Sequence, residues 1–145
     1  MEEVFVLLRF QSFKVKDGEF VARSYRELLV WQKAKALAVI TYQSTESFPR
    51  NETYGLTSQM RRAAVSIASN IAEGQGRLTP GEFLHFLGQA RGSLLELDTQ
   101  VSIALDLGYI RPETCEMLEG QNYQVLGLLN RLIDSLRKKP ETLKP

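Results

Sequence analysis

The stretch that decides the fold is YGLTSQMRRAAVSIASNIAEGQG, residues 54–76. Its apolar side chains recur every three or four residues, which places them on one face of an α-helix: Leu56, Met60, Ala63, Ile67 and Ile71. Gly74 and Gly76 supply the permissive backbone that ends a helix, and the start is expected near Asn51 and Glu52. The stretch therefore predicts one amphipathic helix.

The segment before it predicts another helix, from Ser24 to the pair Phe48-Pro49. Ser24 and Glu27 have the spacing of a capping box, in which each side chain satisfies a free amide of the first turn. The apolar face of this helix is a four-three-four repeat widened by three neighbours: Val30, Ala34, Leu37 and Thr41, with Trp31, Ala38 and Tyr42 beside them.

Two longer helices follow. Thr79, Pro80 and Glu82 stand at the cap and first-turn positions that these residue types prefer, and Gly108 ends this helix. The last helix begins at Pro112 and runs to the Lys138-Lys139-Pro140 segment. Both carry long four-three seams: Phe83, Leu87, Ala90, Leu94, Leu97, Val101 and Ala104 in the first, and Cys115, Leu118, Asn122, Val125, Leu129, Leu132 and Leu136 in the second.

Four helices with short connections predict an all-α fold, an antiparallel up-down-up-down four-helix bundle over residues 24–139. Residues 1–23 form a short N-terminal extension, either disordered or a hairpin around the Asp17-Gly18 turn. Residues 140–145 form a C-terminal tail.

Composition limits the function classes. The chain has 145 residues, is 43% apolar and carries 18 Lys and Arg against 17 Asp and Glu, which is not the balance of a dedicated nucleic-acid binder. It has no apolar run of the ~18 residues that span a membrane, and no basic region precedes the apolar Val4–Leu8 segment, so neither a membrane span nor a signal peptide is expected. Cys115 is the only cysteine, which excludes an intrachain disulfide and favours a cytoplasmic protein.

Catalytic and metal sites find little support. Glu82 and His85 have the Glu-x-x-His spacing of di-iron bundles, but His85 is the only histidine and Glu82 already serves the helix cap. Gly74-Gln75-Gly76-Arg77 lacks the strand and the Gly-Lys-Ser/Thr arrangement of a phosphate loop. The sequence thus predicts a protein that is not an enzyme, with no metal, no cofactor and no small-molecule substrate.

Two polar groups are candidates for other roles. Arg61, Arg62, Arg77 and Arg91 are the candidate nucleic-acid-binding residues, although solvated arginines are the simpler interpretation. Asn70, Glu73 and Asn122 are candidates for a polar network or an interface, because buried amides in helical seams commonly select register and alignment.

Apolar residues outside the main seams suggest self-association. The candidate interface residues are Leu29, Ile40, Leu84, Leu95 and Ile103. The alanines Ala63, Ala64, Ala68 and Ala72 allow close approach of another backbone, either within the bundle or from a second copy. A homo-oligomer is therefore expected, and in a ring even a modest basic cluster would be repeated around an axis.

Three segments carry a family resemblance: VWQKA at 30–34, YGLTSQMRRAAVSIASNIAEGQGR at 54–77 and GSLLELDTQ at 92–100. Over about Tyr25 to Leu136 the chain resembles the four-helix-bundle proteins encoded in intervening sequences of bacterial 23S rRNA genes, which are similar to accessory proteins of diversity-generating retroelements. The resemblance implies a homopentameric ring that acts as a scaffold or, alternatively, as an RNA- or DNA-binding accessory protein. Ala68 stands where the family pattern often has proline, so this helix should be straighter.

Overall fold

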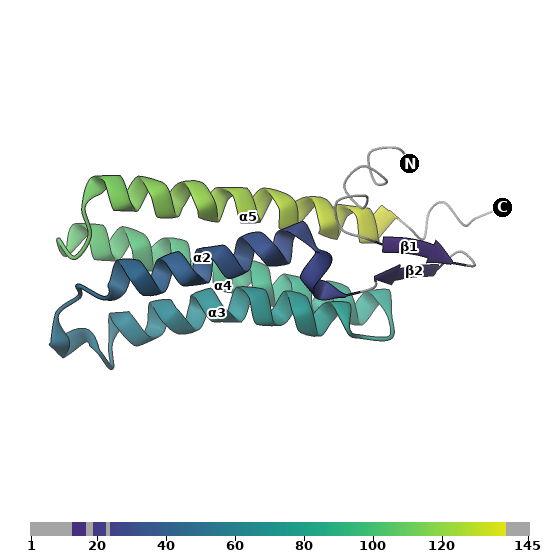
Figure 1. The fold of residues 1–145 in the computed structure, drawn as a ribbon, viewed down its shortest axis with the longest axis horizontal. Coiled ribbons are helices and arrows are strands. Elements are labelled where there is room, and N and C mark those ends of the chain that lie inside the picture. Colours follow the sequence, from purple (N-terminus) through teal and green to yellow (C-terminus); the bar gives the residue numbers. More distant parts are fainter. Residues whose placement is uncertain (1–12, 17–18, 23, 139–145) are drawn as a thin grey trace.

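The computed structural model describes residues 13–16, 19–22 and 24–138, and in these ranges the chain is an α-helical bundle. The long helices are α2 (Leu29–Thr45), α3 (Leu56–Gln75), α4 (Pro80–Asp106) and α5 (Pro112–Lys138). Figure 1 shows each helix running back along the one before it. Because α2 and α4 each pack on both α3 and α5, the four helices surround one core. The expected all-α class is confirmed.

Short elements precede the bundle. Strands β1 (Phe13–Lys16) and β2 (Glu19–Ala22) pair antiparallel, with Phe13 opposite Ala22 and Lys16 opposite Glu19. The expected Asp17-Gly18 turn between them, like the tail at 140–145, lies outside the described residues.

The sequence-predicted seams form the core. Every seam residue of α4 is buried, as are Val30, Ala34, Leu37 and Thr41 of α2. In α3 and α5 only the terminal seam residues, Leu56 and Leu136, remain half-buried. The four-three spacing of apolar residues thus identified the packed face of each helix. Among the helices of the described residues, none is long and apolar enough to cross a membrane.

The predicted start of the first helix was wrong. Ser24 Oγ accepts a hydrogen bond from the Arg26 amide at 3.2 Å and so caps a short 3-10 turn, η1 (Tyr25–Glu27), while α2 begins only at Leu29. Leu28, between the two, has an extended backbone and is fully buried. Insertion of the Leu28 side chain into the core breaks the helix that the capping pattern alone would have continued.

The predicted start of the second helix was also wrong, whereas both predicted ends of α4 are confirmed. A 3-10 turn, η2 (Arg50–Glu52), stands where the second helix was expected to start, and α3 begins after Gly55. Thr79 caps α4 as predicted: its Oγ1 accepts from the Glu82 amide and donates to Glu82 Oε2, both at 3.2 Å. Gly108, with φ of 74°, lets the Tyr109 amide reach the Ala104 carbonyl at 2.9 Å and so closes the end of α4.

Gly74 has a different role from the one its residue type suggested. It lies inside α3 and is buried, and only Gly76 stands at the helix end. A Cβ placed on Gly74 would lie 2.8 Å from Phe86 Cβ and 2.9 Å from Phe83 Cδ2 of α4. Glycine is therefore required here because α3 and α4 approach each other closely, and not because the helix must end.

Candidate functional site

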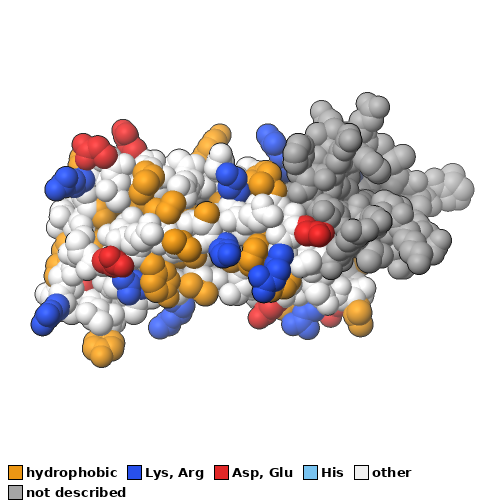
Figure 2. Space-filling view, viewed as in Figure 1, with side chains coloured by type: hydrophobic (Ala, Val, Ile, Leu, Met, Phe, Trp, Pro, Cys, Tyr) orange, Lys and Arg blue, Asp and Glu red, His pale blue; other side chains and the backbone are white. Residues whose placement is uncertain are grey.

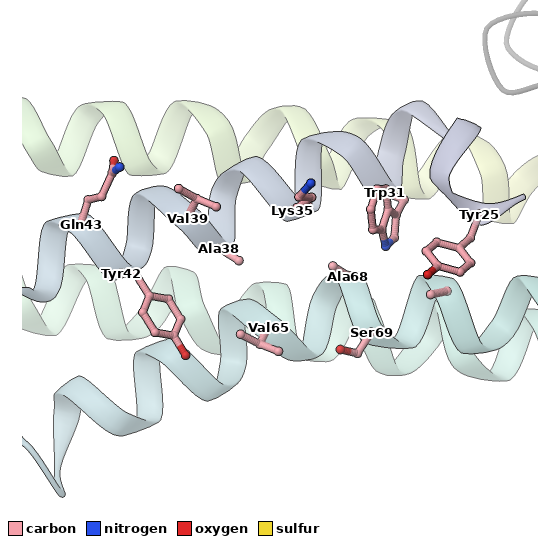
Figure 3. Close-up of a pocket in the computed structure, with 11 residues that line it drawn as sticks. Tyr25, Trp31, Lys35, Ala38, Val39, Tyr42, Gln43, Val65, Ala68 and Ser69 are labelled. Carbon is pink, nitrogen blue, oxygen red and sulfur yellow. The ribbon is translucent and has the colours of Figure 1, made fainter.

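One surface feature is a hollow between α2 and α3, which we call the α2–α3 groove. It has a volume of about 550 Å³ and extends from Tyr25 at one end to Tyr42 at the other. Its lining comes from two helices: Trp31, Lys35, Ala38 and Val39 on α2, and Val65, Ala68, Ser69 and Ala72 on α3. Figure 3 shows the aromatic rings at the two ends of the groove and the small side chains between them.

Small residues create this hollow. Ala63 and Ala64 of α3 are buried in the core, whereas Ala68 and Ala72 are half-buried along the groove. The methyl side chains of Ala68 and Ala72 leave the space between Trp31 and Tyr42 unfilled, so the groove stays open. Because α3 is one helix from Leu56 to Gln75, Ala68 continues it without a break.

An aromatic and cationic cluster forms the Tyr25 end. The Tyr25 and Trp31 rings meet edge to face with centroids 5.1 Å apart. Lys35 Nζ lies 5.5 Å from the Trp31 centroid, and Arg26 Cζ lies 5.4 Å from that of Tyr25. The positive charges of Lys35 and Arg26 therefore lie beside the aromatic rings at this end of the groove.

Arg61 stabilises the Tyr42 end. Its Nε donates to Thr45 Oγ1 at 2.9 Å, a terminal guanidinium nitrogen donates to the Tyr42 carbonyl at 3.3 Å, and Cζ lies 4.6 Å from the Tyr42 centroid. Arg61 thus joins α3 to α2 through two hydrogen bonds and one contact with an aromatic ring. Its neighbour Arg62 is exposed and lines a second hollow with Ser58 and Ser66.

The groove exposes a hydrophobic surface to solvent. The exposed fractions of Val39, Tyr42 and Val65 are 49%, 43% and 43%. Figure 2 shows hydrophobic side chains gathered along the middle of this face, with Lys and Arg side chains beside them. Exposed apolar residues that gather in one hollow, and are not scattered singly, are typical of an interaction site.

The candidate nucleic-acid-binding residues do not meet in one place. Arg61 and Arg62 lie on the groove side of α3, whereas Arg77 lies beyond the end of α3, with Cζ 4.6 Å from the Phe86 centroid. At 1.5 Å per residue, Arg62 and Arg77 are roughly 22 Å apart along the helix direction. Arg91 is exposed on α4. The four candidate arginines of one chain therefore do not form a single basic cluster.

Among the candidate polar residues, Asn122 hydrogen-bonds to another helix, whereas the Asn70 amide bonds to Ser66 within α3. Asn70 Nδ2 donates to the Ser66 carbonyl at 2.8 Å and contacts Ser66 Oγ at 2.9 Å, while Ser66 Oγ pairs with Ser93 Oγ of α4 at 3.0 Å. Asn122, 5% exposed, donates from Nδ2 to the Leu94 carbonyl at 3.1 Å and so joins α5 to α4. Glu73 is exposed on α3.

The candidate interface residues divide into two groups. Leu95 and Ile103 are 49% and 44% exposed on α4. Leu29, Ile40 and Leu84 are half-buried, and Ile40 and Leu84 pack against the core. Only the two α4 residues of this set are open enough to contribute substantial apolar area to a partner.

The side chains with potential chemical reactivity, those of Cys115, His85 and Glu82, make contacts with neighbouring residues of their own helices or of the helix cap. Burial, followed by a hydrogen bond to Glu119 with Sγ to Oε1 at 3.3 Å, raises the pKa of the Cys115 thiol to about 11. His85 Nε2 pairs with Gln89 Nε2 at 3.1 Å, and Glu82 takes part in the cap of α4. Within the described ranges, no group of three or more His, Cys, Asp or Glu residues is placed to hold a metal ion.

Sequence reasoning missed the groove. It assigned Trp31, Ala38 and Tyr42 to the core face of the first helix, whereas Trp31 and Ala38 are half-buried and Tyr42 is exposed. The available signal was the width of that face: Val30, Trp31, Ala34 and Val39 spread over more of the helix than one core contact covers.

Comparisons with known proteins agree with the architecture. The family model described as 23S rRNA-intervening sequence protein matches residues 26–131. One similar solved structure is that of a protein of unknown function from the S23 ribosomal protein family of Bacteroides thetaiotaomicron. It is 21% identical, with a TM-score of 0.67, and the match covers 73% of this chain and 96% of that one. No curated protein matches the chain.

Proposed function

Because the chain belongs to the 23S rRNA-intervening sequence protein family, we propose that it is a non-catalytic, cytoplasmic subunit of a homo-oligomeric scaffold. The similar structure from Bacteroides thetaiotaomicron belongs to a protein described as having unknown function. The family resemblance of the sequence favours five subunits. In this proposal the protein acts by presenting surfaces in a fixed, repeated arrangement, and no residue performs bond chemistry.

The observation that carries this proposal is the exposed α2–α3 groove. Val39, Tyr42 and Val65 are each more than two-fifths exposed, whereas most residues of the apolar seams are buried. Removing apolar surface from water is worth roughly 25 cal/mol per Å², so a partner that covers the groove would gain free energy from its apolar lining. A second copy is always present at the concentration of the protein itself.

The test is the mass of the wild-type protein in solution. Sedimentation velocity and light scattering over a broad concentration range should give the mass of several chains, with five as the expected number. The mass should depend only weakly on concentration above the dissociation constant. A mass of one chain throughout the range would refute the scaffold proposal.

A second candidate function is RNA or DNA binding, favoured by the charge of the groove face. Lys35 lines the groove, Arg61 and Arg62 line the hollow beside it, and neither lining includes an acidic residue. A ring would repeat this face, so several weak phosphate contacts would act together.

Titration with labelled structured RNA separates the two functions. An RNA-binding accessory protein should bind tightly at low salt and much more weakly at moderate salt. Arg62→Ala removes an exposed arginine beside the groove, and Arg131→Ala removes one from α5 as a matched control. Weaker binding only in Arg62→Ala would support the nucleic-acid function. Absence of salt-dependent binding by the intact oligomer would leave the scaffold function alone.

A further inference from the structure

We infer that the α2–α3 groove of one copy binds the outer edge of α4 of a second copy, in a head-to-tail contact. This inference rests on the proposed homo-oligomeric function and names the two surfaces that build the oligomer. The α4 edge is defined here by Gly88, Gly92, Leu95, Thr99 and Ile103.

The shape of the α4 edge fits a groove. Its residues are all exposed and recur at four-three-four-four spacing, so they lie on one side of α4. A Cβ added at Gly88 or Gly92 would have no neighbour within 4 Å, which shows that the surface over both glycines is open. Leu95 and Ile103 project beyond these glycines and are about half exposed. The edge therefore combines a thin backbone ridge with two apolar side chains.

Charge complementarity selects this edge as the occupant. Helix α4 carries four acidic residues, Glu82, Glu96, Asp98 and Asp106, against one arginine, Arg91. The groove face has the opposite balance, with Lys35 in the lining and Arg62 beside it. Glu96 is exposed and lies four residues after Gly92 and three before Thr99, so its side chain borders the α4 edge. Opposite charges then face each other across the contact.

The same charges disfavour a symmetric contact between two grooves. In an isologous pair each groove meets the same groove of the second copy. The positive charges of Lys35 and Arg26, which lie near Trp31, would then approach the same positive charges of the second copy. The head-to-tail arrangement avoids this repulsion. It also leaves each chain with one groove and one α4 edge to use, because α2 and α4 lie diagonally across the bundle. Such contacts extend from copy to copy and end when a ring closes.

Two single variants and their mixture test the inference. Val65→Arg blocks the groove, and Leu95→Arg blocks the α4 edge. Met117→Arg is the matched control, because Met117 on α5 is as exposed as Val65, at 43%, and belongs to neither surface. Mass is measured by sedimentation velocity at one concentration, and helix content by circular dichroism.

The expected result is specific to a head-to-tail contact. Each of Val65→Arg and Leu95→Arg should have the mass of one chain, and Met117→Arg should keep the wild-type mass. An equimolar mixture of the first two should give a two-chain species and nothing larger. The Val65→Arg chain still offers an intact edge, the Leu95→Arg chain still offers an intact groove, and the resulting pair exposes only blocked surfaces.

Other outcomes overturn the inference in distinguishable ways. A wild-type protein with the mass of one chain refutes the proposed scaffold and the contact together. Wild-type mass in Val65→Arg or Leu95→Arg refutes the contact alone, and leaves the groove to a different partner. Two single-chain variants that do not combine, or dissociation of Met117→Arg, also refute it. If an arginine variant loses helix content, Lys35→Glu and Glu96→Lys replace the pair: each should reduce the oligomer, and the double variant should restore it.

Discussion

Replacement of Gly74 by alanine tests the close approach of α3 and α4. In an open helical position, glycine to alanine stabilises a helix by about 1 kcal/mol, because alanine loses less backbone entropy on folding. At Gly74 the new Cβ would lie 2.8 Å from Phe86 Cβ, 2.9 Å from Phe83 Cδ2 and 3.3 Å from the Phe83 carbonyl oxygen. Phe86 Cβ is fixed to the backbone of α4, so the two helices must separate.

Overpacking of a core costs typically about 1–3 kcal/mol. We therefore expect Gly74→Ala to lower the free energy of unfolding by up to about 2 kcal/mol, since the helix-propensity gain offsets part of that cost. For a domain of this size the change corresponds to a fall in melting temperature of up to about 8 °C.

Urea unfolding followed by circular dichroism at one protein concentration measures the change, with Gly127→Ala as the control. Gly127 lies inside α5, and a Cβ there would have no neighbour within 4 Å, so this variant should be up to about 1 kcal/mol more stable than the wild type. If Gly74→Ala is as stable as the wild type or more stable, the reasoning is refuted. The close contact between α3 and α4 would then impose no cost on a side chain at residue 74.

Three further predictions concern single groups. Thr79→Ala removes the side-chain cap of α4 and should lower the free energy of unfolding by about 1 kcal/mol, whereas Thr79→Ser should preserve it in the same urea titration. Asn122→Ala removes the buried hydrogen bond to the Leu94 carbonyl and should cost about 1 kcal/mol, and an unchanged midpoint would show that this bond contributes nothing. The folded state keeps the Cys115 proton more firmly than the unfolded state, since its pKa rises from 9.0 to about 11, so this contribution to stability is complete below pH 9 and is lost as the pH rises to about 11. Thiol alkylation at pH 9 should accordingly be slow in the folded protein and fast in urea, and equal rates would contradict the burial of the thiol.

Sequence patterns alone determined the all-α class and the packed face of each helix, because burial of apolar side chains at helical spacing is a local and periodic signal. The Thr79–Glu82 cap and the turn at Gly108 were predictable for the same reason: the groups that satisfy each helix end lie within a few residues. The family resemblance, confirmed over residues 26–131, rested on the same segments.

Tertiary structure decided what depends on partners distant in the sequence. Arg61 is held by Tyr42 and Thr45, sixteen or more residues away, and Gly74 is required by two phenylalanines of the next helix. The groove itself exists because the small residues of α3 happen to face Trp31 and Tyr42 of α2. Helical periodicity says which side chains share a face, but the rotation and separation of two packed helices decide which of those side chains meet a neighbour and which remain open to solvent.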